Sequence, residues 1–270
     1  MSRTILMPTL SGVISVREKT NPPEIIFYGT SGWFETESDR TSCVGIFPNE
    51  ADVILFDLGT GVRGLKKDHV HDKHLTVVLS HLHLDHSQGL HLLPMFRPAR
   101  LTVIIHRSLQ AHLERLFSYP FVKPAHELGF PVEIRAVEDG RIDFGGWALD
   151  TRSLQHNTPV IGARLQMKGG QSVTYCVDTT LCDGLLDLAG DCNILVIEAS
   201  PPDNQKTNGF HLDLVQLRTV LAATGANKVI LTHFGALKYP DMASRERLHP
   251  HIGDCHDNIV MAHDGLIVRL

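Results

Sequence analysis

Three histidines and an aspartate lie within six consecutive positions of this sequence: His81, His83, Asp85 and His86. Imidazole and carboxylate groups together are typical ligands of zinc and neighbouring first-row metals. In an extended segment or an irregular loop, His81 and His83 can point to the same side. Asp85 and His86 are offset from that pair, so they suit a second metal beside the first better than they complete one tetrahedral site. Because crowded imidazoles gain nothing from proximity without a metal, we predict a metal site here.

The elements that position these residues can be read from short apolar runs. Residues 75–79, directly before the histidines, form such a run and predict a buried strand. Similar runs occur at residues 53–56, 101–105, 173–177, 194–197, 229–231 and 266–268. Residues 108–117 and 212–224 have the apolar spacing of helices. No repeat or linker interrupts the sequence, so we predict that residues 1–270 form one domain of the α/β or α+β class.

Ionisable residues follow most of these predicted strands. They are Asp57, His81, His106, Asp178, Glu198 and His233. Strand ends in layered α/β structures often converge on a ligand-binding crevice, so residues distant in sequence can share one site. We expect Leu82 and Leu84, which alternate with the first histidines, to anchor their loop in the core.

The composition is that of an ordinary globular protein, with 270 residues, 43% of them hydrophobic, and a formal charge of −5. No apolar stretch approaches the roughly 20 residues of a membrane span, and no signal peptide is evident, so we expect a soluble cytoplasmic protein without a membrane partner. Five cysteines without a C-x-x-C spacing fit free thiols. The net acidity argues against nucleic-acid binding through bulk charge.

The histidine-rich segment resembles the H-x-H-x-D-H signature of the metallo-β-lactamase-fold hydrolases, and other segments match that family in order and spacing. Residues 40–43 and 54–61 resemble its first β-hairpin and its D-x-G turn. Residues 155–162 are similar to its third-histidine motif, 175–179 to the strand with the bridging aspartate, and 231–234 to the last metal-histidine motif. The resemblance covers most of the chain and implies a four-layer αβ/βα sandwich with a metal site at one edge of the sheets.

Carried over residue by residue, the resemblance implies two divalent metal ions, Zn²⁺ before Mn²⁺ or Fe²⁺. It places His81, His83 and His156 on one ion, Asp85, His86 and His233 on the other, and Asp178 between them. We expect Asp85 to act as a catalytic residue as well as a ligand. Two cations, two carboxylates and a bridging hydroxide sum to about +1, which favours a small anionic substrate. A metal-bound water that loses its proton near neutral pH would be the nucleophile.

Three positions indicate which branch of the family the sequence resembles. His83 stands where the flavodiiron oxygen reductases typically carry Glu, which favours hydrolysis over redox chemistry. Asp178 stands where antibiotic-hydrolysing members typically have Cys, which disfavours β-lactam hydrolysis. Residues 209–213 resemble a segment of ribonuclease Z and related phosphodiesterase-like proteins, and the resemblance implies that His211 contacts the phosphate and protonates the leaving group. Alternatively, His211 is a helix-start residue that makes a local backbone bond.

These features predict a hydrolase of small phosphodiesters, such as a cyclic nucleotide or a nucleotide-derived ester. Residues 106–150 lack the long Gly/Pro-rich basic arm typical of transfer-RNA processing enzymes, so a large nucleic acid is a poor expectation. A thioester or other acyl hydrolase, a ribonuclease Z-like endonuclease and a non-catalytic metal-binding protein stay open as alternatives. A homodimer is compatible with the sequence.

The other polar residues have simpler expected roles. We expect Asp57 and Glu198 to orient metal ligands, His106 to end a strand, and residues 262–265 to form a turn. We expect six histidines on the surface: His69, His71, His74, His91, His112 and His126. A loop-like stretch could bind an additional metal through His249, His251, Cys255 and His256.

Overall fold

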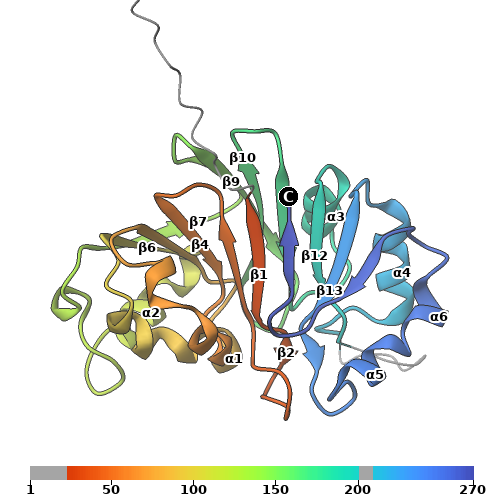
Figure 1. Ribbon diagram of the computed structural model, residues 1–270, viewed down its shortest axis with the longest axis horizontal. Coiled ribbons are helices and arrows are strands. Elements are labelled where there is room, and N and C mark those ends of the chain that lie inside the picture. The colour runs from red at the N-terminus through yellow and green to blue at the C-terminus, as the bar shows by residue number, and fades with distance from the viewer. Residues whose placement is uncertain (1–22, 201–208) are drawn as a thin grey trace, which may run out of the picture.

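Two seven-stranded sheets face each other in the computed structural model, which describes residues 23–200 and 209–270 (Figure 1). The first sheet has the order β16-β1-β3-β4-β5-β6-β7 and the second β15-β13-β12-β11-β10-β9-β8. A buried apolar cluster drawn from both sheets, including Ile25, Phe56, Tyr175 and Val196, lies between them. The predicted four-layer α/β sandwich is confirmed, because two further clusters join the outer faces of the sheets to the helices.

Both sheets are mixed. The strands of the first sheet are β1 (Glu24–Gly29), β3 (Cys43–Phe47), β4 (Asp52–Phe56), β5 (His74–Val78), β6 (Arg100–His106), β7 (Val132–Val137) and β16 (Ile267–Arg269). Those of the second are β8 (Gly140–Asp143), β9 (Trp147–Leu154), β10 (Val160–Met167), β11 (Ser172–Cys176), β12 (Ile194–Glu198), β13 (Lys228–Thr232) and β15 (Ile259–Met261). Strands β4 to β7 are parallel to one another, as are β11, β12, β13 and β15. A short parallel pair, β2 (Ser31–Gly32) and β14 (Phe234–Gly235), forms a third sheet.

Helices cover the outer face of each sheet (Figure 1). The α-helices are α1 (Leu84–Ser87), α2 (Gln110–Leu116), α3 (Asp183–Gly190), α4 (Leu214–Ala223), α5 (Met242–Glu246) and α6 (His249–Ile252). Short 3-10 helices span Thr60–Gly64, Lys67–His69, Gln88–Met95, Arg107–Leu109 and Ala125–Glu127. Helix α4 begins two residues later than expected, because Asp213 accepts a hydrogen bond from the Gln216 amide and closes a capping box.

Most of the simpler expectations hold. His106 ends β6, and its Nδ1 accepts a hydrogen bond from the Ser108 amide at 3.2 Å. Residues 264–265 form the expected turn. All five cysteines are free. Within the described residues no helix combines the length and apolarity needed to cross a membrane.

Two expectations about side-chain environment are wrong. His74 is buried rather than on the surface, because it starts β5 inside the sheet. Its Nε2 is hydrogen-bonded to Thr102 Oγ1 at 2.9 Å, and its Nδ1 lies 3.2 Å from Asp52 Oδ1. Leu84 is 70% exposed and does not enter the core, since the chain turns into α1 at this residue, whereas Leu82 packs partly against the core. The residues 249–256 do not appear among the metal-ligand groups of the described chain.

Candidate metal centre

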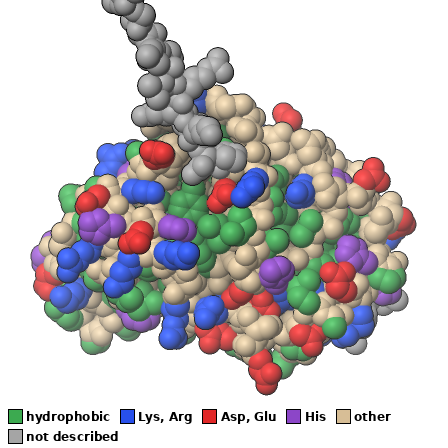
Figure 2. Space-filling view, in the orientation of Figure 1, with side chains coloured by type: hydrophobic (Ala, Val, Ile, Leu, Met, Phe, Trp, Pro, Cys, Tyr) green, Lys and Arg blue, Asp and Glu red, His purple; other side chains and the backbone are tan. Residues whose placement is uncertain are grey.

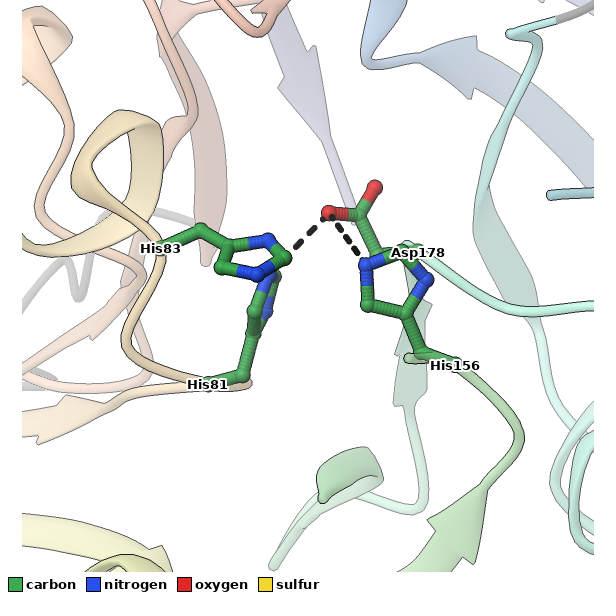
Figure 3. Close-up of side chains that lie close together, drawn as sticks. All are labelled: His81, His83, His156 and Asp178. Carbon is green, nitrogen blue, oxygen red and sulfur yellow. Dashed lines mark ion pairs between the residues drawn. The ribbon is translucent and has the colours of Figure 1, made fainter. Parts of the chain in front are cut away.

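The parallel strands of the two sheets bring their carboxyl ends to one edge, where the predicted ligands meet. His81 and His83 follow β5, whereas His156 lies between β9 and β10 and Asp178 follows β11 (Figure 3). Figure 3 shows the two histidines of the first half of the chain facing Asp178 and His156 across a common space. Residues separated by about a hundred positions therefore share one site, as the strand-end argument predicts.

Backbone strain marks the same strand ends. Six non-glycine residues of the described chain have positive φ, and four of them come directly after or close to strand ends at the site: Trp33 at 71°, Asp57 at 61°, Asp178 at 53° and His233 at 50°. This left-handed conformation disfavours most side chains and persists only where the surrounding structure holds it. The side chains of Asp178 and His233 meet there, with His233 Nδ1 3.0 Å from Asp178 Oδ1, and that of Asp57 contacts His86 at 2.7 Å.

The first group of potential ligands contains His81, His83, His156 and Asp178, whose ligand atoms all lie within 4.8 Å of one another. His156 Nδ1 donates to the Phe210 carbonyl at 2.8 Å, which leaves its Nε2 free to coordinate. Burial lowers the pKa of His81 to about 4, so this imidazole is neutral at pH 7 and has the form that binds metals.

The geometry around His81 fits a cation. Ser80 Oγ donates its proton to Asp57 at 3.0 Å, so it accepts the hydrogen bond from His81 Nδ1, also at 3.0 Å. The lone pair of His81 Nε2 then faces Asp178 Oδ2 at 3.2 Å. His81 Nε2 is buried without a hydrogen-bond partner, whereas Asp178 Oδ1 lies 3.0 Å from His233 Nδ1. A buried unpartnered nitrogen is costly, and a metal ion between His81 Nε2 and the Asp178 carboxylate would satisfy it.

The second group contains Asp85, His86, Asp178 and His233. His86 Nε2 lies 3.1 Å from His233 Nε2, 3.1 Å from Asp178 Oδ2 and 3.3 Å from Asp85 Oδ2. Although burial opposes it, the surrounding carboxylates raise the pKa of His86 well above its usual value and that of His233 to about 10. Positive charge is therefore strongly favoured at this position. The donor set fits a divalent cation, which would supply that charge in place of protons.

Asp57 supports the second group without belonging to any of the ligand groups found in the described chain. Its side chain is completely buried and accepts hydrogen bonds from the Ser80 amide at 2.7 Å and the Tyr175 hydroxyl at 2.9 Å. His86 Nδ1 donates to Asp57 Oδ2 at 2.7 Å. This contact fixes the tautomer of His86 and aims its Nε2 at the second group.

We therefore expect Asp57→Asn to weaken metal binding by about 10- to 100-fold. Asparagine keeps the size of the side chain and tolerates positive φ, but its amide replaces an acceptor that His86 needs. Competition with a chromophoric chelator measures the affinity. Asp52→Asn, the same substitution at the start of β4, is the control and should leave the affinity unchanged. Equal affinities for the wild type and Asp57→Asn would contradict the orienting role.

His211 forms a third group of potential ligands with Asp178, Glu198 and His233, and it is paired with the buried carboxylate of Glu198. Its Nδ1 donates to Glu198 Oε2 at 3.0 Å and lies 3.7 Å from Asp178 Oδ1. Burial acts against the charged imidazole, but the Glu198 carboxylate outweighs it and raises the pKa of His211 above its ordinary value. The Thr179 amide donates to Glu198 Oε1 at 2.5 Å and holds this carboxylate in place. Asp213, rather than His211, caps α4, which disfavours the helix-start interpretation of His211.

A cavity of about 700 Å³ opens over these residues. Its lining includes Asp85, His156, Asp178, His211 and His233. Lys238 is the one lysine or arginine that lines it within the described residues. The contribution of Lys238 was not expected, because a single exposed lysine has no sequence pattern that distinguishes it from other surface cations.

The loop of residues 31–34 was also unexpected at this site. Its backbone pairs with the segment after His233 through β2 and β14, and a side chain at Gly32 would lie only 2.6 Å from the His233 ring. Glycine is therefore required for the loop to approach this closely. Two adjacent aromatic residues after that glycine, Trp33 and Phe34, are the signal that could have indicated the loop.

Comparison with known proteins agrees with this geometry. Residues 53–234 match a family model described as the beta-lactamase superfamily domain. The chain belongs to this superfamily. Its predicted metallo-β-lactamase fold is confirmed by solved structures with that fold. Superfamily membership and the His/Asp groups indicate a metal-dependent hydrolase.

Three proteins illustrate what this chain is similar to. An uncharacterised protein of Mycobacterium tuberculosis (strain ATCC 25618 / H37Rv) is 27% identical over 207 residues, which cover 72% of each chain. Ribonuclease Z of Acaryochloris marina is 22% identical over 282 residues, covering 82% of this chain and 88% of the enzyme. A solved diphosphatase of the PhnP family has a TM-score of 0.70 and 18% identity, covering 93% of this chain and 98% of that chain, and shares the fold.

Proposed function

We propose that this protein is a dinuclear metal-dependent phosphodiesterase that hydrolyses small, nucleotide-derived phosphodiesters. The observation that carries the proposal is the place of Asp178, which belongs to the first and second ligand groups as well as to the third, which contains His211. Its Oδ2 lies 3.2 Å from His81 Nε2 and 3.1 Å from His86 Nε2. One carboxylate shared by two groups favours two adjacent cations, an arrangement suited to phosphate ester hydrolysis.

The donor set favours Zn²⁺, because imidazole nitrogens outnumber carboxylate oxygens in it. His81, His83 and His156 would hold one ion, Asp85, His86 and His233 the other, and Asp178 both. When bound, such ions lower the pKa of a coordinated water and stabilise negative charge on phosphoryl oxygens.

The protein's own residues orient the ligands, donate a proton and attract the substrate. Asp57 and the Phe210 carbonyl fix the tautomers of His86 and His156. Glu198 keeps the His211 imidazole protonated and oriented through Nδ1, so that Nε2 can donate its proton to the departing alkoxide. Lys238 places one positive charge at the mouth of the cavity, where it favours the approach of an anion.

A ribonuclease Z-like endonuclease is the second candidate, and the similarity to ribonuclease Z over 82% of this chain favours it. The charge distribution favours a smaller substrate. The net charge is −5, and basic side chains are interspersed with acidic ones on the face shown in Figure 2. Nucleic-acid binding usually depends on a concentrated basic surface. Five free thiols further support a cytoplasmic location for the proposed enzyme.

A substrate panel tests the proposed reaction. The Zn²⁺-loaded chain is assayed with a cyclic nucleotide, a linear phosphodiester, a transfer-RNA precursor and an acyl thioester. We expect turnover of the two small diesters and loss of that turnover when a chelator removes the metal. Turnover of the thioester alone would identify an acyl hydrolase and contradict the proposal. Preferential cleavage of the RNA would favour the second candidate.

A further inference from the structure

Exposed apolar side chains gather at the mouth of the active-site cavity. The described chain has eleven exposed large hydrophobic residues. Five of them line this one cavity: Trp33, Phe34, Leu84, Phe210 and Leu237. Scattered surface hydrophobics are ordinary, but a cluster around a polar site indicates a binding surface. We call these five residues the apolar rim.

Trp33 is the largest and among the most exposed members of the apolar rim. Its side chain is 82% exposed, although it belongs to a residue with a φ of 71°. This conformation is unfavourable for a bulky residue, and local contacts must hold it. The Trp33 amide donates to Asp85 Oδ2 at 2.7 Å, and Ser31 Oγ donates to the Phe34 carbonyl at 2.8 Å. These hydrogen bonds hold the backbone that carries the exposed indole, and one of them joins Trp33 to a proposed metal ligand.

The loop that carries Trp33 and Phe34 lies beside the proposed metal ligand His233. Strand β2 lies between the two halves of the molecule, at the bottom of the view in Figure 1. It pairs with β14, which directly follows His233, so Ser31 lies opposite Phe234 and Gly32 opposite Gly235. The backbone that carries the aromatic residues is therefore held at a defined place beside the catalytic groups.

We propose that Trp33, assisted by Phe34, is a stacking platform for the nucleobase of the substrate, an inference that rests on the proposed phosphodiesterase function. A planar base matches the flat indole face, and such stacking tolerates different bases. The cavity volume of about 700 Å³ lies within the usual range for small-molecule sites. A single lysine in its lining suits one phosphate group better than a polyanion.

Tryptophan fluorescence tests this platform without requiring hydrolysis. The chain has two tryptophans, and the other one, Trp147, is 3% exposed and stacked on Phe144. We expect AMP to quench the emission of Trp33 in the full-length, metal-loaded protein with saturation, and ribose 5-phosphate to leave it unchanged. Equal responses to the two ligands, or no response to AMP, would overturn the platform. A ligand-free emission shift that rises with protein concentration would instead assign the apolar rim to contacts between copies.

Variants separate stacking from other effects. Isothermal calorimetry should show AMP affinity about tenfold lower in Trp33→Ala, with ribose 5-phosphate affinity unchanged. Trp33→Phe should restore most of the lost affinity, because it keeps an aromatic face. Phe121→Ala removes an exposed aromatic residue outside the cavity and should match the wild type. AMP binding through Trp33 in a chain that hydrolyses no phosphodiester would refute the proposed function while leaving the platform intact.

Discussion

Asp178→Asn is expected to lower phosphodiester turnover by more than about 100-fold and to reduce the bound metal below two ions per chain. Substitutions of residues that merely orient metal ligands cost roughly 10- to 100-fold, so removal of a shared ligand should cost more. The structure gives the reason. Asp178 Oδ2 contacts histidines of both groups, at 3.1 Å and 3.2 Å, and no other carboxylate belongs to both.

Asparagine is the suitable replacement because it preserves the volume of the buried side chain and tolerates the φ of 53° at this position. Alanine would add a cavity and backbone strain to the loss of charge. Elemental analysis by mass spectrometry measures the metal content, and circular dichroism verifies the fold. Asp183→Asn, the same change at an exposed position at the start of α3, should leave both metal content and turnover unchanged. Two tightly held ions in Asp178→Asn would show that this residue does not bridge them.

The second large effect is expected for His211→Ala, and it should depend on the leaving group. General-acid catalysis contributes about 10²- to 10⁴-fold, and alkoxides need a proton far more than p-nitrophenolate does. Turnover of an alkyl phosphodiester should therefore fall by about 100-fold or more, whereas hydrolysis of its p-nitrophenyl counterpart should fall by about tenfold or less. Metal content should not change, because His83, His156 and the other proposed ligands are intact.

Paired kinetic measurements on the two esters test this role. His112→Ala replaces an exposed histidine on α2 and provides the control, with wild-type turnover on both substrates. Glu198→Gln should reproduce part of the His211→Ala pattern, since the amide cannot hold the imidazole in its charged form as the carboxylate does. Equal losses on the two esters in His211→Ala would argue that His211 binds the substrate without donating a proton.

Most of the strands that the sequence predicts are almost completely buried, and β16, whose first and last residues are exposed, is the exception. Strands β5, β11 and β12 are buried at every position and therefore read as largely apolar runs. The long hairpin of β9 and β10 was not predicted, because polar residues interrupt it where its strands are partly exposed. Strand β3 contains Gly45, which a strand pattern disfavours. A side chain there would lie 2.8 Å from the Tyr28 ring, so the glycine serves a close approach that only the folded chain displays.

Some residues of the candidate site can be recognised from the local sequence, and others only from the folded structure. His81 to His86 form a motif dense enough to indicate metal binding without a fold, whereas His156 and His233 gain their meaning from family spacing and from the convergence of strand ends. Trp33 and Lys238 lie at exposed positions, where neither periodicity nor a local motif constrains the residue. Their relation to the site depends on the pairing of β2 with β14 and on the cavity that results.

The most direct test of the central claim is a titration of the metal-free chain with Zn²⁺. Native mass spectrometry counts the bound ions at each step, and turnover of a cyclic nucleotide is measured in parallel. The arrangement of both ligand groups around Asp178 predicts that two ions bind per chain and that turnover reaches its maximum only when both are present. Full turnover with one ion per chain, or two bound ions with no turnover of any phosphodiester, would contradict a dinuclear phosphodiesterase.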